Sequence, residues 1–140
     1  MVQTSGVVIG SLNDARQGGQ NASIQQTMTN VRSQAELYYN GPGNFSYTGL
    51  CANSTSTRNG VIAALDVVNA PATNLIVDGT GPAANDAANE ANRDAACQSN
   101  ANSYQITVPL ADGTNFWCVD ATGFSGQLTT APGNTDTTCS

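Results

Sequence analysis

The fold is decided by residues 24–38, which read Ile-Gln-Gln-Thr-Met-Thr-Asn-Val-Arg-Ser-Gln-Ala-Glu-Leu-Tyr. The apolar residues of this stretch recur at intervals of four, three, four and three: Ile24, Met28, Val31, Ala35 and Tyr38. This spacing places all of them on one face of an α-helix. We expect the helix to begin near Gly10 and to end at Asn40, because the following Gly-Pro-Gly can cap a helix but cannot continue it. About 30 helical residues would extend about 45 Å.

The composition predicts one domain that does not bind nucleic acid. The chain has 140 residues, a length typical of a single domain, and a net charge of −6. Its basic residues are scattered and include no lysine: Arg16, Arg32, Arg58 and Arg93. Binding to a phosphate backbone or to an anionic membrane surface would need a basic patch, which the sequence does not contain.

The four cysteines predict two disulfides. Cys51, Cys97, Cys118 and Cys139 are widely spaced, and the chain has neither a Cys-x-x-Cys pair nor a histidine. A zinc site would need closely paired ligands, so disulfides fit better. Four cysteines allow three pairings. Disulfides also imply maturation outside the cytoplasm, and we therefore expect that an export segment has been removed upstream of Val2.

The first part of the predicted helix has apolar residues without an obvious partner in the chain. These are Val7, Val8, Ile9, Leu12 and Ala15. A helix that is covered at one end and apolar at the other is typical of a subunit that packs against copies of itself. We therefore interpret these five residues as an assembly helix.

Gly18 and Gly19 form a weak point within the helix, because each glycine costs about 1 kcal/mol relative to alanine. They could break the helix in two, or they could form a flexible joint between an assembly stem and a folded part. The sequence leaves both alternatives open.

The remainder of the chain predicts an α+β fold. Residues 41–100 read as loops with a short helix at 61–68, capped by Ser56 or Thr57, and with a brief apolar run at 75–77 that could be a strand or a buried loop. Residues 104–110 alternate between apolar and polar, and residues 116–120 and 124–130 follow as further strands after turns. We expect a three- to four-stranded antiparallel sheet packed on the long helix. The helix–sheet core would contain the apolar stripe of 24–38 together with Trp117, and this helix is the only element long enough to cover the sheet.

The sequence does not resemble an enzyme. Without histidine it has no Ser-His or Cys-His pair and no imidazole ligand. We expect no cofactor. Calcium is the one metal considered, because Asp112 with Asn115 or Asp120 could supply oxygen ligands, but the chain lacks the spaced aspartates of a calcium-binding loop.

The order of these parts resembles the type IV pilins and the pseudopilins of type II secretion. The resemblance is carried by residues 6–16, 22–25 and 31–39, with the double tyrosine at its end, and by Phe-Trp-Cys-Val-Asp-Ala-Thr-Gly at 116–123. It implies a long N-terminal helix packed on an antiparallel sheet. It divides the chain into a helical stem (1–40), a loop and short-helix region (41–100), and a sheet with a disulfide-tied tail (101–140). It also favours the pairs Cys51–Cys97 and Cys118–Cys139, since the second pair resembles the C-terminal loop closure of pilins.

The resemblance implies the structural subunit of an extracellular filament, either a type IV pilus or a pseudopilus. Its partners would be copies of itself and the pilus or secretion machinery. Membrane contact would occur only through an apolar N-terminal segment, which holds pilins in the inner membrane before assembly and which this sequence does not contain. The alternative is a secreted or pilus-tip binding module, similar to an adhesin-like minor pilin, that recognises a ligand through Asn/Ser/Thr-rich loops.

Overall fold

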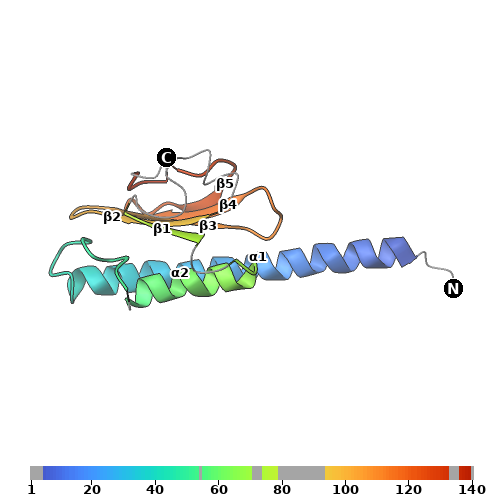
Figure 1. Cartoon of the computed structure of the whole chain (residues 1–140), viewed down its shortest axis with the longest axis horizontal. Coiled ribbons are helices and arrows are strands. Elements are labelled where there is room, and N and C mark those ends of the chain that lie inside the picture. The colour runs from blue at the N-terminus through green and yellow to red at the C-terminus, as the bar shows by residue number, and fades with distance from the viewer. Residues whose placement is uncertain (1–4, 54, 71–73, 79–93, 133–135, 140) are drawn as a thin grey trace.

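The computed structural model describes residues 5–53, 55–70, 74–78, 94–132 and 136–139, with side chains from residue 12 onward. Two helices form one layer, and a five-stranded sheet lies across them as a second layer (Figure 1). The predicted α+β fold, with a long N-terminal helix packed on the sheet, is confirmed.

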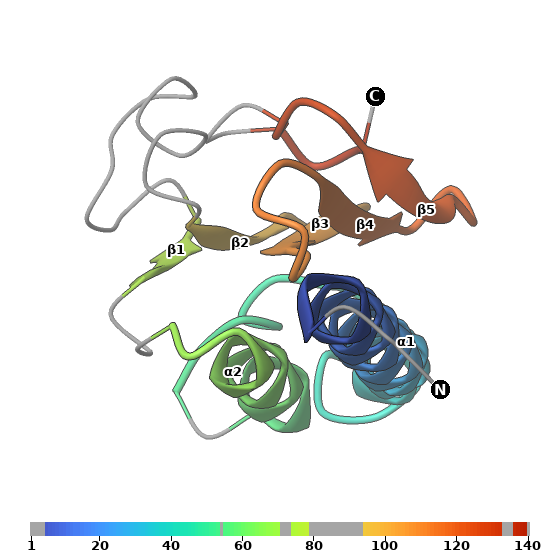
Figure 2. The same cartoon turned by 90° about the vertical axis from the view of Figure 1, so that its right-hand side faces the viewer.

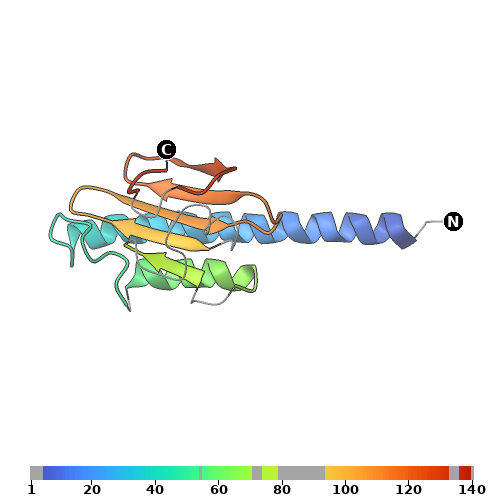
Figure 3. The same ribbon diagram turned by 45° about the horizontal axis from the view of Figure 1, so that its top comes forward.

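Helix α1 (Ser5–Asn40) is continuous over 36 residues, which corresponds to about 54 Å. It passes through Gly18 and Gly19 without a break, so the alternative of two separate helices is wrong. The helix ends where predicted, because the backbone N–H groups of Gly41 and Gly43 both donate to the Tyr38 carbonyl, at 3.2 and 2.7 Å. The first part of α1 extends well beyond the rest of the molecule (Figures 1 and 3).

Helix α2 (Ser56–Val67) runs beside α1 on the same side of the sheet (Figure 2). Its N-cap is Thr55, one residue before the predicted caps, and the Thr55 hydroxyl accepts a hydrogen bond from the Arg58 N–H at 3.1 Å. Val61 and Leu65 are fully buried against the core. The expectation that α1 alone covers the sheet is therefore wrong, because α2 supplies part of the apolar layer.

The sheet has the strand order β1-β2-β3-β4-β5. The strands are β1 (Leu75–Val77), β2 (Ala95–Ser99), β3 (Tyr104–Pro109), β4 (Phe116–Asp120) and β5 (Ser125–Leu128). Strand β1 pairs with β2 in parallel, and the other neighbours are antiparallel. The sheet is thus larger than the predicted three to four antiparallel strands. Of the two alternatives for residues 75–77, the strand is the one formed, whereas β2 was not predicted as a strand.

The two faces of the sheet differ in chemistry, because successive side chains of a strand point to opposite sides. Toward the helices, Tyr104, Ile106 and Val108 of β3 join the same apolar cluster as the buried residues of α1 and α2. On the other face, Gln105 and Thr107 are also buried. The C-terminal segment after β5 lies on that second face, opposite the helices (Figures 1 and 2).

Candidate assembly helix and disulfide-tied head

The molecule has two parts, which we call the projecting segment (residues 5–19 of α1) and the head (the described residues from Gln20 onward). Residues 12–19 are all exposed, and Leu12 is 62% exposed. The head begins at Gln20, whose side-chain amide donates to the Val67 carbonyl at 3.3 Å, and at Asn21, whose side-chain oxygen accepts from the Ala111 N–H at 2.7 Å.

The predicted assembly residues fall in the projecting segment. Leu12 and Ala15 are exposed to solvent. Val7, Val8 and Ile9 belong to the helical backbone of α1, but their side chains lie outside the described residues. No helix in the described part of the chain is both long enough and apolar enough to cross a membrane.

Four of the six predicted core residues lie at the centre of the helix–sheet core. Ile24, Met28, Val31 and Ala35 are all at most 1% exposed. Tyr38 and Trp117 also pack against this core but are only partly buried. For Tyr38 the reason is its position in the last turn of α1, where its hydroxyl donates to the Thr48 carbonyl at 2.6 Å in the following loop.

Both disulfides are present in the pairing that the pilin resemblance favoured. Cys51 is joined to Cys97 of β2, with a Cα–Cα distance of 5.8 Å, and Cys118 of β4 is joined to Cys139, with a Cα–Cα distance of 6.0 Å. The first ties the loop after α1 to the sheet, and the second ties the C-terminal segment to its far face. Two disulfides indicate an oxidising location, outside the cell or in the periplasm.

Asp120 holds the C-terminal segment in place together with the second disulfide. Its carboxylate accepts hydrogen bonds from the Thr122 and Phe124 N–H groups at 2.9 and 3.2 Å, and from the Cys139 N–H at 2.8 Å. The Thr122 hydroxyl donates as well, at 2.5 Å. Burial disfavours the charged form, but these hydrogen bonds outweigh it and keep the Asp120 pKa below its usual value.

The far face of the sheet carries buried polar side chains, beside the apolar Ile76 and Ala96, and the sequence analysis did not predict that a polar segment covers them. The Gln105 amide donates to the Asp136 carbonyl at 3.2 Å, and the Asn100 amide donates to the Thr137 hydroxyl at 3.3 Å. The Thr107 hydroxyl donates to the Gln105 side-chain oxygen. Alternation along β3 predicts a polar second face but does not distinguish a face exposed to water from one covered by a polar segment.

The residues considered for calcium are engaged in turns. The Asp112 carboxylate accepts from the N–H groups of Thr114 and Asn115 at 3.0 and 2.9 Å and from the Asn115 amide at 2.8 Å. Asp120 lies at the opposite end of β4 from this turn. The described residues include no group of three or more histidine, cysteine, aspartate or glutamate side chains that could hold a metal ion.

No protein-family model, curated protein or solved structure matches this chain. The arrangement itself, a long N-terminal helix packed through its second half on a C-terminal mixed sheet, is consistent with a pilin-like α+β architecture.

Proposed function

We propose that this chain is the structural subunit of an extracellular helical filament, of the type IV pilus or pseudopilus kind, and that it polymerises through α1. The observation that carries the proposal is the division of α1. Its second half is buried in the head, whereas residues 12–19 contact nothing that would bury them. A long exposed helix is marginal by itself in water, so tertiary or quaternary packing usually supports one.

The pattern of residues on α1 supports helix–helix packing beyond the head. Leu12, Ala15, Gly19 and Ala22 recur at intervals of three, four and three, and all four are exposed. This spacing matches the apolar seam of packed helices, and small residues let two helices approach closely. At 100° per residue the seam lies about 160°, close to half a turn, away from the stripe that includes Ile24, so it is a separate face.

The proposal requires an apolar segment ahead of the projecting segment. Val7, Val8, Ile9 and Leu12 would contribute about 1.5–3 kcal/mol each if fully buried. Association first costs about 4–15 kcal/mol in lost translational and rotational freedom. The balance is too small for a stable polymer, so this 140-residue chain is expected to be a monomer or a weak oligomer, held in a filament only when further apolar residues precede it.

A pair of charge substitutions tests the proposed seam. The chain would be expressed behind an apolar segment of about 20 residues, the length that spans a bilayer, in a host with pilus machinery. Leu12→Asp places a charge in the seam and should abolish fibres in sheared surface material. Gln17→Asp places the same charge on an exposed polar position and should leave the fibre yield unchanged.

The fibre yields of the two variants can be compared only if both heads are equally stable. Both positions are exposed in the projecting segment, so the melting temperatures of the purified variants should match that of the parent chain. Equal fibre yields from Leu12→Asp and Gln17→Asp would contradict the assignment of the seam.

A secreted or tip-located binding module is the second candidate function. It is favoured by a pocket at the end of the head, which is lined by part of the Ser/Thr-rich run 54–57. A filament subunit should be abundant in sheared fibres, whereas a tip module should be rare in them.

A further inference from the structure

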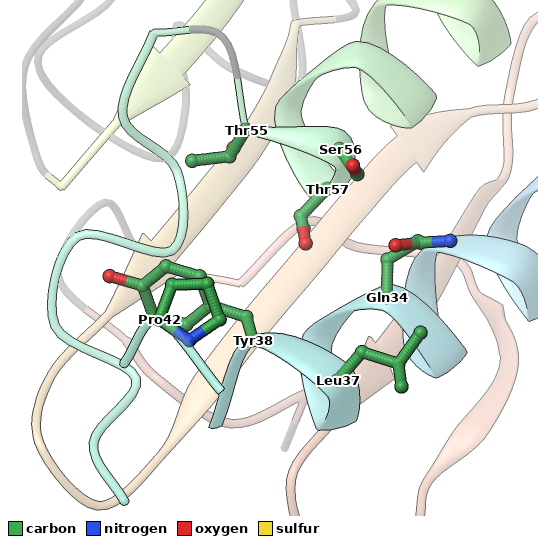
Figure 4. Close-up of a pocket in the computed structure, with 7 residues that line it drawn as sticks. All are labelled: Gln34, Leu37, Tyr38, Pro42, Thr55, Ser56 and Thr57. Atoms are coloured by element: carbon green, nitrogen blue, oxygen red, sulfur yellow. The ribbon is translucent and has the colours of Figure 1, made fainter. Parts of the chain in front are cut away.

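A pocket of about 330 Å³ lies where the C-terminal end of α1 faces the N-terminal end of α2 (Figure 4). This is the end of the head farthest from the projecting segment (Figure 1). Seven residues from α1, the following loop and α2 line the pocket: Gln34, Leu37, Tyr38, Pro42, Thr55, Ser56 and Thr57.

The lining combines ring and alkyl surfaces with uncharged polar groups. Tyr38 and Pro42 contribute rings, and Leu37, which is 63% exposed, adds an alkyl surface. The Gln34 amide and the Ser56 hydroxyl have no hydrogen-bond partner within the described part of the chain. They are therefore available to a ligand without breaking an existing bond. A few polar groups on a mainly apolar wall is the usual composition of a small-molecule site.

No charged side chain lines the pocket. The two nearest in sequence are engaged elsewhere. Glu36 accepts a hydrogen bond from the Tyr47 hydroxyl at 3.0 Å, and the Arg58 guanidinium donates to the Cys51 carbonyl at 3.3 Å. An anionic or cationic ligand would lose its hydration here without gaining an opposite charge, so the lining favours a neutral ligand.

The walls of the pocket are held in place before any ligand arrives. The Tyr38 hydroxyl is bonded to the Thr48 carbonyl, and the Thr55 hydroxyl donates to the Leu50 carbonyl at 2.7 Å. Gly43 lets the loop close over the Tyr38 ring, because a Cβ at Gly43 would lie 2.7 Å from Tyr38 Cε1. A pre-formed site loses little conformational entropy on binding.

We propose that this pocket binds a neutral sugar unit of a glycan. The C–H face of a pyranose ring can lie on the Tyr38, Pro42 and Leu37 surfaces, while its hydroxyls bond to the Gln34 amide and the Ser56 hydroxyl. A second pocket of about 340 Å³, where α1 enters the head, offers no aromatic ring to such a face. The sugar site is independent of filament formation.

The test uses the full 140-residue chain and its amide NMR spectrum. Methyl glycosides of glucose, galactose, mannose, N-acetylglucosamine and N-acetylgalactosamine are titrated singly, with methyl glucuronide as an acidic sugar and triglycine as a peptide. At least one neutral glycoside should shift the amides of the pocket residues. Gln34→Ala should weaken its binding about tenfold, as expected for the loss of one hydrogen bond.

A matched pair of variants distinguishes binding in the pocket from binding to other exposed apolar side chains at this end of the head. Leu37 lines the pocket and Phe45 does not, yet their exposures are similar at 63% and 67%. Leu37→Ala should weaken sugar binding, whereas Phe45→Ala should not. Leu12→Asp, which disrupts the proposed seam, should leave sugar binding unchanged.

Three results would overturn the sugar site. The first is that no neutral glycoside shifts the pocket amides up to its solubility limit. The second is that methyl glucuronide or triglycine shifts them in place of the neutral sugars. The third is that Leu37→Ala and Phe45→Ala have equal effects while both variants remain folded.

Discussion

Gly60 lies where α2 packs tightly against Val31 of α1, and adding a single methyl group there tests the packing of the two helices. A Cβ built on Gly60 would lie 2.4 Å from Cγ2 of Val31, closer than real Cβ atoms come to other heavy atoms. Val31 is 1% exposed. A β-branched side chain in a helix has one strongly preferred rotamer, so moving the Val31 side chain to another rotamer costs energy.

Gly60→Ala therefore sets two effects of known sign against each other. Replacing glycine by alanine inside a helix gains about 1 kcal/mol. Overpacking a filled core costs about 1–3 kcal/mol. We expect Gly60→Ala to be destabilising by up to about 2 kcal/mol, the difference between the two effects.

Two further variants serve as controls. Gly19→Ala meets nothing within 4 Å, so it should be neutral or stabilising by up to about 1 kcal/mol. Val31→Ala removes the methyl groups with which the added methyl group of Gly60→Ala would clash. In that background Gly60→Ala should become stabilising, and the coupling energy between the two sites should be about 1–3 kcal/mol.

Urea unfolding of the oxidised protein, with both disulfides intact, measures all of these free energies. The reasoning would be refuted if Gly60→Ala stabilised the chain as much as Gly19→Ala does, or if the effects of Gly60→Ala and Val31→Ala were simply additive.

Three more predictions concern buried groups of the head. Asp120→Asn should cost about 1–3 kcal/mol at neutral pH, because an amide donor replaces the oxygen that accepts from the Cys139 N–H. Because the Asp120 pKa is lowered in the folded protein, the carboxylate stabilises the fold above its unfolded-state pKa, and this stability is lost as the pH falls through the folded-state pKa. Urea unfolding at several pH values should therefore show that the difference in unfolding free energy between Asp120→Asn and the parent shrinks below about pH 4. Tyr104→Phe should be neutral or stabilising in thermal unfolding, since the buried Tyr104 hydroxyl has no hydrogen-bond partner in the described part of the chain; a loss above about 1 kcal/mol would mean that a partner exists. Val31→Asp should cost several kcal/mol because it buries an unpaired charge, whereas Ser33→Asp on the exposed face should cost little, and equal melting temperatures would show that the helix faces are misassigned.

The elements that sequence reasoning located are those with strong local signals. The apolar stripe from Ile24 to Ala35 fixes both the helix and its buried face, and Gly41 with Pro42 marks its end. Strand β3 was found because its residues alternate between apolar and polar.

The elements that were missed depend on tertiary contacts. Strand β2 (Ala95–Ser99) contains alanine, cysteine, glutamine and serine, which have no strong preference for strands, and it forms by pairing with β3 and β1. The contribution of α2 to the core depends on how it packs on α1 through Gly60, which no local pattern reveals.

The features of the candidate site that were predicted also have local signals in the sequence, and those that were missed depend on tertiary contacts. The exposure of Leu12 and Ala15 agrees with an apolar stretch that lacks an internal partner. The role of Val7, Val8 and Ile9 stays a prediction, since their side chains lie outside the described residues. The covering of the far face by the C-terminal segment and the pocket between α1 and α2 both depend on contacts between separate segments, so spacing could not indicate them.

The central claim is that α1 drives polymerisation once apolar residues precede it, and one comparison tests it most directly. The chain is expressed with and without a preceding apolar segment of about 20 residues in a host with pilus machinery, and sheared surface material is imaged by electron microscopy. The account predicts fibres from the longer form and none from the shorter. Fibres from the shorter form, or none from the longer form despite correct processing, would contradict it.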